Sequence, residues 1–122
     1  MLEQHQIQRL LDIAFVGCQQ GRSGLARQVI EGLDLLLEDS LELEICRAMS
    51  FYTVNDFGRA REILDAAAEK FAHDPMCITH LALVDILEGE TAQARERLDG
   101  VIAQNKDAEA VQLATSLVAE YF

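Results

Sequence analysis

The sequence of 122 residues has no tryptophan and only one proline, Pro75. Because proline breaks the interior of a helix, its rarity permits helices over nearly the whole chain. Basic residues are also few, with 10 Lys and Arg against 21 Asp and Glu, which gives a formal net charge of -11. A surface this acidic repels nucleic acid and anionic membranes, so we expect neither as a partner. It favours solubility and a basic or apolar protein partner.

Segments that would carry the chain into or across a membrane are also lacking. No apolar run approaches the length of a membrane span, and no basic region precedes an apolar core at the start, so we expect no signal peptide.

The three cysteines, Cys18, Cys46 and Cys77, lie on separate expected helices and cannot all pair. An odd, scattered set of this kind favours a reducing cytoplasm.

Residue patterns that support catalysis or metal binding are missing as well. The sequence has no glycine-rich phosphate loop and no nucleophile elbow, and its cysteines lack metal-ligand spacing. His5, His73 and His80 are scattered, and the His73-Asp74 pair lies in a break between expected helices, where a surface pair is the simpler interpretation. We therefore expect no enzyme, no metal and no cofactor.

The chain does have residues of the same kind that recur every 34 positions. The stretch from Glu44 to Phe71 predicts two amphipathic helices joined by a tight turn. Steps of 34 residues bring four kinds of position into register: Ala14, Ala48 and Ala82; Ala26, Ala60 and Ala94; the turn residues Gly21, Asn55 and Gly89; and Ile30, Leu64 and Leu98. Small side chains let paired helices approach closely, and glycine or asparagine tolerates a left-handed turn. This helix-turn-helix period is the signature of the tetratricopeptide repeat.

The sequence therefore predicts an all-α, tetratricopeptide-repeat-like right-handed superhelix of three helix pairs plus a C-terminal capping helix. We expect one domain over residues 1–122, with repeats at about 5–38, 39–72 and 73–106 and the capping helix at 107–121. Ser23 and Ser40 should cap the helices that follow them, Pro75 suits a first helical turn, and Asn105 should end a helix. Beyond Ile7 the first helix is apolar nearly all round, so we expect it to be covered on more than one side.

In a tetratricopeptide array the first helix of each pair lines the concave surface, so residues near its repeated alanine should face a groove. These positions are mainly apolar: Leu11, Phe15, Ile45, Met49, Tyr52, Leu83 and Ile86. An apolar trough suits the apolar face of an amphipathic helix from a partner protein. The alternative interpretation is that the same residues fill the core of a tightly curled array.

The segment LLDIAFVGCQQGRSGLARQVIEGL, residues 10–33, consists of an apolar helix ending at a glycine, a short polar turn and a second helix. With its three repeats, C-terminal helix, small size and acidic pI, nearly the whole chain resembles the small tetratricopeptide chaperones of type III secretion that hold the needle subunit before export (the YscG, PscG and SsaH type). The resemblance implies a bacterial cytoplasmic protein with two partners. The needle subunit's amphipathic C-terminal helix would lie in the concave groove, and a small helical co-chaperone would pack against the N-terminal repeat.

A surplus of apolar residues in the first repeat fits a docking surface for that co-chaperone, or self-association when the partners are absent: Leu2, Ile7, Leu33, Leu35, Leu36 and Leu37. Two other interpretations stay open. Translocator chaperones of the same secretion system also carry three repeats, but they are longer and have an extra N-terminal region. A generic tetratricopeptide scaffold or adaptor would be a monomer that is stable alone.

Overall fold

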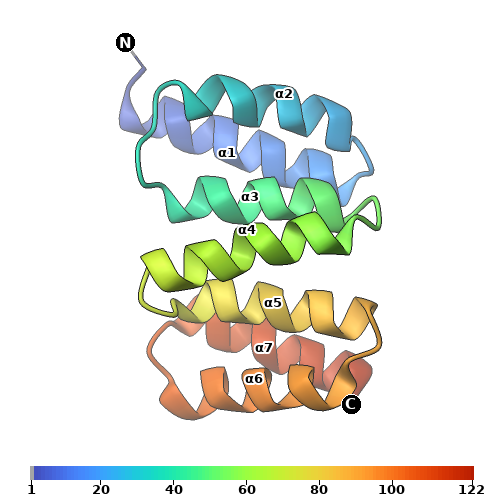
Figure 1. The fold of residues 1–122 in the computed structure, drawn as a ribbon. Coiled ribbons are helices and arrows are strands. Elements are labelled where there is room, and N and C mark those ends of the chain that lie inside the picture. The colour runs from blue at the N-terminus through green and yellow to red at the C-terminus, as the bar shows by residue number, and fades with distance from the viewer. Residues whose placement is uncertain (1) are drawn as a thin grey trace. The chain divides into compact units, whose positions relative to one another are not determined.

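The structure is a computed structural model that describes residues 2–122, and over that range it contains seven α-helices and no β-strand (Figure 1). The helices are α1 (Gln4–Gln19), α2 (Ser23–Asp34), α3 (Leu41–Tyr52), α4 (Phe57–Lys70), α5 (Pro75–Leu87), α6 (Thr91–Gln104) and α7 (Ala108–Tyr121). The second helices of the three pairs begin at Ser23, Phe57 and Thr91, which are successive steps of 34 residues. The predicted all-α fold, with three helix pairs and one further helix, is confirmed.

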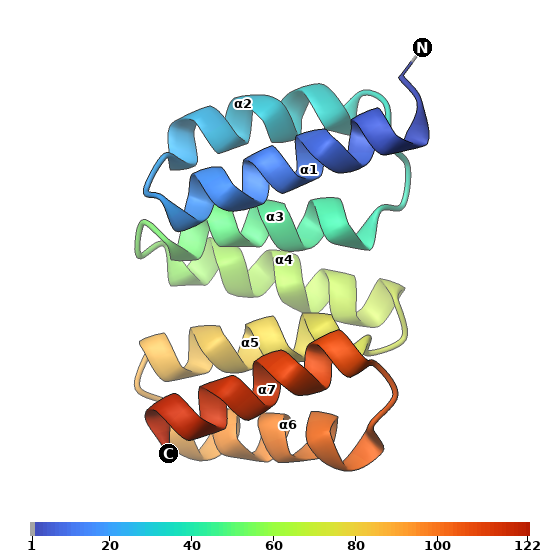
Figure 2. The same ribbon diagram turned by 180° about the vertical axis from the view of Figure 1, so that it is seen from behind.

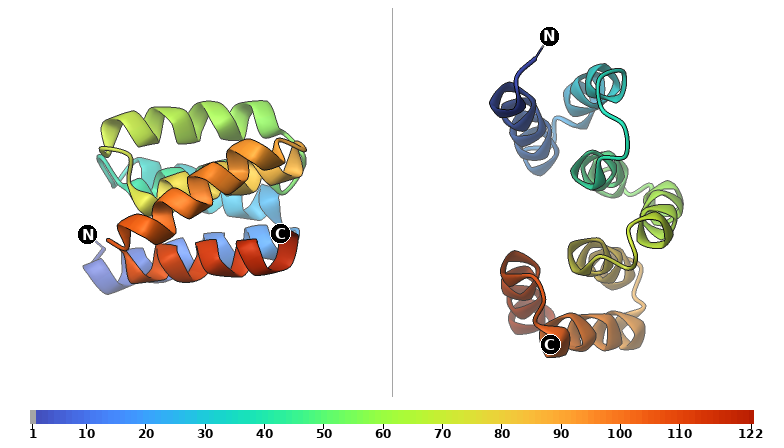
Figure 3. Two further views of the ribbon diagram at one scale, coloured as in Figure 1. Left: turned by 90° about the horizontal axis from the view of Figure 1, so that it is seen from below. Right: turned by 90° about the vertical axis from the view of Figure 1, so that its left-hand side faces the viewer.

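Residue contacts divide the chain into two units, Met1–Ile63 and Leu64–Phe122, and the division falls inside α4. In the first unit, α1 packs against α2, and both pack against α3. In the second unit, α5 packs against α6, and α7 lies against both of them (Figures 2 and 3). Helix α7 therefore covers a helix pair, as the sequence predicts for a capping helix. That all 122 residues form a single domain and a right-handed superhelix stays a prediction.

The turn within each helix pair has the backbone conformation that the sequence predicts. Gly21, Asn55 and Gly89 have φ values of 77°, 67° and 83°, all in the left-handed region. Glycine reaches this region without strain, and asparagine reaches it more easily than most residues. These three positions, one period apart, are where the chain reverses direction between the two helices of a pair.

Most of the predicted helix ends are also correct. The Leu43 backbone N–H donates to Ser40 Oγ at 3.2 Å, so Ser40 caps α3. Pro75 occupies the first turn of α5, and Asn105 ends α6 with a left-handed φ of 48°. The prediction for Ser23 is wrong: α2 already includes this residue, and Arg22 precedes the helix without a side-chain capping bond.

The repeated alanines lie in the core. All six are 2% exposed or less: Ala14, Ala26, Ala48, Ala60, Ala82 and Ala94. In the second unit, Ala82 and Ala94 belong to a cluster with Leu98, Val101 and residues of α7. Because alanine keeps helix propensity while adding little bulk, these positions allow the helices of a pair to pack closely.

Enlarging one of these alanines should therefore destabilise the fold. We expect Ala94→Leu to lower the free energy of unfolding by roughly 1–3 kcal/mol, because a well-packed core has no room for the added carbons. Ala103 is exposed on the same helix, α6, so Ala103→Leu is a matched control that should change stability by only about 0.5 kcal/mol. Urea unfolding of both variants measures the difference. Equal losses would contradict the assignment of the small positions.

Candidate protein-binding site

The residues predicted to line a groove divide into two sets by exposure. Leu11, Ile45, Met49 and Tyr52 are 6% exposed or less and belong to the core. Burial also raises the pKa of the Tyr52 phenol. For these four residues the structure agrees with the core interpretation, because their side chains are not open to a partner.

Phe15, Leu83 and Ile86 keep part of their surface exposed. Phe15 lies on α1 in the first unit, and about a third of it is exposed. Leu83 and Ile86 lie on α5 and are half-buried, packed against the core cluster of the second unit. An apolar residue with one side on the core and the other in solvent is held in a fixed position and can still contact another protein. Of the seven predicted groove residues, these three can serve as partner contacts.

The six residues predicted as a docking surface in the first repeat also differ. Leu35 is 89% exposed, Leu36 is exposed, and Leu2, Ile7 and Leu37 are half-buried. Leu33 does not share this surface, because it is 1% exposed. The reason is that α2 ends at Asp34. Leu33 therefore occupies the last helical turn, three residues after buried Ile30, and points into the core, whereas Leu35 and Leu36 follow the helix and face solvent.

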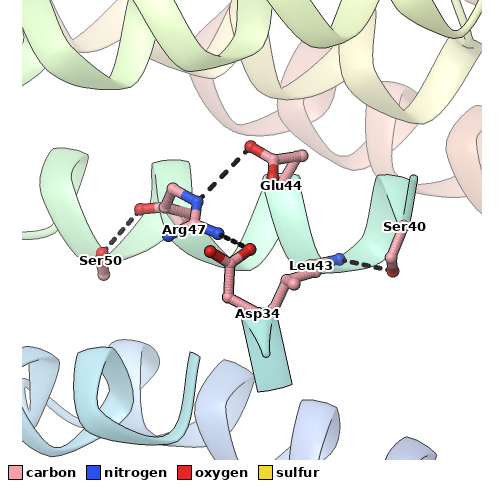
Figure 4. A network of polar contacts seen from close by, with 6 residues as sticks. All are labelled: Asp34, Ser40, Leu43, Glu44, Arg47 and Ser50. Atoms are coloured by element: carbon pink, nitrogen blue, oxygen red, sulfur yellow. Dashed lines mark hydrogen bonds and ion pairs between the residues drawn. The ribbon is translucent and has the colours of Figure 1, made fainter. Parts of the chain in front are cut away.

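Polar contacts fix the end of α2 beside α3 (Figure 4). Arg47 on α3 donates to Asp34 Oδ1 at 2.7 Å and forms an ion pair with Glu44. Arg27 on α2 donates to the Ser50 carbonyl oxygen at 2.7 Å, so a second arginine joins the same two helices. Since Asp34 directly precedes Leu35, these contacts restrain the segment that carries the exposed leucines.

A further apolar surface, which the site prediction did not include, lies on α1 and the start of α2. Ile13, Val16 and Leu25 are each roughly half-exposed. They line a cavity of about 320 Å³, which we call the end groove, together with Arg9, Asp12, Gly17, Gln20 and Arg22. The signal for this surface in the sequence was the nearly all-round apolar character of the first helix. Such a helix needs cover on more than one side.

The three cysteines are buried in the core, and burial makes their thiols poorly reactive. Burial raises the pKa of the Cys46 and Cys77 thiols to about 12 and also raises that of Cys18. A thiol with so high a pKa stays protonated at neutral pH and is a poor nucleophile. Between residues 2 and 122, no three His, Cys, Asp or Glu side chains are placed to hold a metal ion.

Over the part of the chain that the structure describes, none of the helices is both long and apolar enough to span a bilayer.

Comparison with known proteins gives one family match. The family model described as tetratricopeptide repeat matches residues 53–118, a segment that begins just before α4 and ends within α7. This is more than half of the chain. Neither the curated proteins nor the solved structures contain a match.

Proposed function

Since the chain belongs to the tetratricopeptide repeat family, a family of protein-binding scaffolds, we propose that it is a cytoplasmic chaperone of a bacterial type III secretion system. In this proposal it binds the amphipathic helix of the needle subunit in a concave groove, acts with a small helical co-chaperone, and prevents premature polymerisation. The observation that carries the proposal is the set of exposed apolar residues on a strongly acidic repeat protein. Apolar surface of this kind marks sites of protein interaction.

The subunit would contact the predicted groove residues that remain exposed. In the second unit, Leu83 and Ile86 on α5 present apolar surface while their other sides pack on the core cluster. In the first unit, Phe15 on α1 is about a third exposed. Burying a large apolar side chain stabilises a complex by about 1.5–3 kcal/mol, so two or three such anchors offset a substantial part of the cost of association. The acidic charges around them would mainly steer the encounter and keep the complex soluble.

The mechanism is competition for one apolar stripe. A subunit that polymerises through an amphipathic helix exposes that stripe until it reaches the growing filament. A chaperone that covers the stripe removes the surface on which the next subunit would pack. Release at the export machinery then restores the ability to polymerise.

The co-chaperone would use a different surface. Leu35 and Leu36, with half-buried Leu2 and Ile7, present apolar area in the first unit. The ion pair between Asp34 and Arg47 restrains this segment, which lowers the entropy lost when a partner binds. A small helical protein is a suitable occupant, because its own apolar face would otherwise be exposed.

Co-expression with the needle subunit encoded in the same genome tests the proposal. Wild-type protein should co-purify with monomeric subunit, and Leu83→Glu and Phe15→Glu should each weaken capture roughly 100-fold, because a carboxylate would be buried in the complex. Val54, exposed in the turn before α4 and outside the predicted groove, supplies the control variant Val54→Glu, which should capture normally. Circular dichroism checks that helical content is unchanged.

The outcome also separates the alternatives. Capture that survives both substitutions would show that these residues are not the binding site. Capture of a translocator protein in place of the needle subunit would favour the translocator chaperone. If neither component is captured, the generic scaffold or adaptor remains, which the family match by itself supports.

A further inference from the structure

Two positions of the end groove, those of Asp12 and Val16, are buried in the other two repeats. One period after Asp12 and Val16 lie Cys46 and Ser50 on α3, and one period later lie His80 and Val84 on α5; these four residues are buried. Helix α3, which carries Cys46 and Ser50, packs against both helices of the preceding pair, α1 and α2. Within residues 2–122, α1 packs only on α2 and α3, so the corresponding face of α1 stays open.

We propose that a second copy of this chain covers the end groove, forming a two-fold symmetric dimer in which the two α1 helices pack antiparallel. In such a dimer the same patch meets itself, so the patch must be complementary to itself in shape and in charge. This contact is separate from the surfaces assigned to the needle subunit and the co-chaperone, and it does not depend on that function.

The exposed apolar residues fix how the two helices align. Ile13 and Val16 lie three residues apart on one face of α1, on adjacent turns. An antiparallel pairing that sets Ile13 opposite Val16 of the second copy joins the exposed apolar residues at the two-fold axis. The same alignment sets Asp12 opposite Gly17 of the second copy.

This alignment also brings opposite charges together. The Arg22 backbone N–H donates to the Gly17 carbonyl oxygen at 2.7 Å, so Arg22 lies beside Gly17. Asp12 of one copy therefore meets Arg22 of the other, and symmetry produces the pair twice. Gln8 donates to Asp12 Oδ1 at 3.0 Å and holds the carboxylate in place, with its second oxygen available to the arginine.

The charge balance of the end groove favours this face over others for self-association. The chain carries a net charge of -11, which opposes contact between two copies over most of the surface. The end groove instead contains two arginines and one aspartate, so two copies meet there without net repulsion between acidic groups. Leu25 adds apolar area at the same place.

Sedimentation equilibrium over a range of protein concentrations tests the dimer. We expect the wild-type chain to show a monomer–dimer equilibrium and Val16→Glu to raise its Kd at least tenfold. Asp12→Arg and Arg22→Asp should each weaken the dimer as well, since each places like charges together. The double variant Asp12→Arg with Arg22→Asp should regain the wild-type Kd, because the swapped pair can form again across the axis. Rescue of this kind distinguishes contact across the interface from a loss of folding.

Matched controls separate this surface from the others. Leu35→Glu, on the docking surface at the other end of α2, and Leu83→Glu, on α5, should leave the dimer unchanged. Wild-type protein that remains monomeric up to about 1 mM, a concentration at which even weak specific complexes form, would overturn the proposal. A dimer that tolerates Val16→Glu would overturn it too, as would a double variant that fails to regain the wild-type Kd. If the chain stays monomeric and a different protein covers the end groove, the proposal is overturned and the groove is assigned to that protein.

Discussion

Replacing Arg97 with methionine is expected to lower the free energy of unfolding by about 3 kcal/mol. Arg97 Nη1 on α6 lies 2.7 Å from Asp85 Oδ2 on α5, and the Asp85 side chain is 0% exposed. Removing one partner of a buried ion pair leaves the other charge in the core without its counter-ion, which typically costs about 3–5 kcal/mol. We expect the lower end of this range because Arg97 itself retains some contact with solvent. Urea unfolding at neutral pH measures the loss.

Two further variants make that measurement specific. Arg95 lies on the same helix and pairs with Asp99 at the surface, so Arg95→Met should cost less than about 1 kcal/mol. Replacing both buried partners, as Asp85→Leu with Arg97→Met, should recover most of the stability that Arg97→Met loses, because no uncompensated charge is left. If Arg97→Met were no more damaging than Arg95→Met, the pair would not be buried in solution.

The helix pairs could be predicted because packing imposes the same requirements on every repeat. Each close approach needs a small residue and each tight turn needs a residue that accepts a positive φ, so alanines and turn residues recur every 34 positions. The buried ion pair could not be predicted in this way. One and two periods before Asp85 stand Phe51 and Gly17, so the position carries no repeated chemistry. Only the packed structure shows that Asp85 is fully buried.

The exposure of apolar residues was harder to predict than their position on a helix. Phe15 and Met49 occupy equivalent places in successive repeats, yet Phe15 is partly exposed and Met49 is buried. Periodicity identifies the face of a helix, whereas burial depends on which neighbouring elements cover that face. The leucines at the end of α2 show a second limit, because the residue at which the helix ends decides whether Leu33 or Leu35 faces solvent.

The other large effect concerns pH. His80 on α5 is 4% exposed, and this burial lowers its pKa to about 4, from an ordinary value of 6.5. Between pH 6.5 and pH 4 the unfolded chain binds a proton at this side chain and the folded chain does not. The free energy of unfolding therefore falls as the pH drops through this window, by about 1 kcal/mol per pH unit. We expect His80 to account for a loss of about 2 kcal/mol between pH 7 and pH 5.

Urea unfolding at pH 7 and pH 5 tests this expectation when wild type is compared with His80→Gln. Glutamine keeps a side chain that forms hydrogen bonds but does not titrate, so the variant should lose about 2 kcal/mol less than wild type over this interval. The many carboxylates contribute their own pH dependence, but it is common to both proteins and cancels in the difference. If His80→Gln and wild type lost equal stability, the buried histidine would have to accept its proton in the folded chain. The core around α5 would then open to solvent well above pH 4.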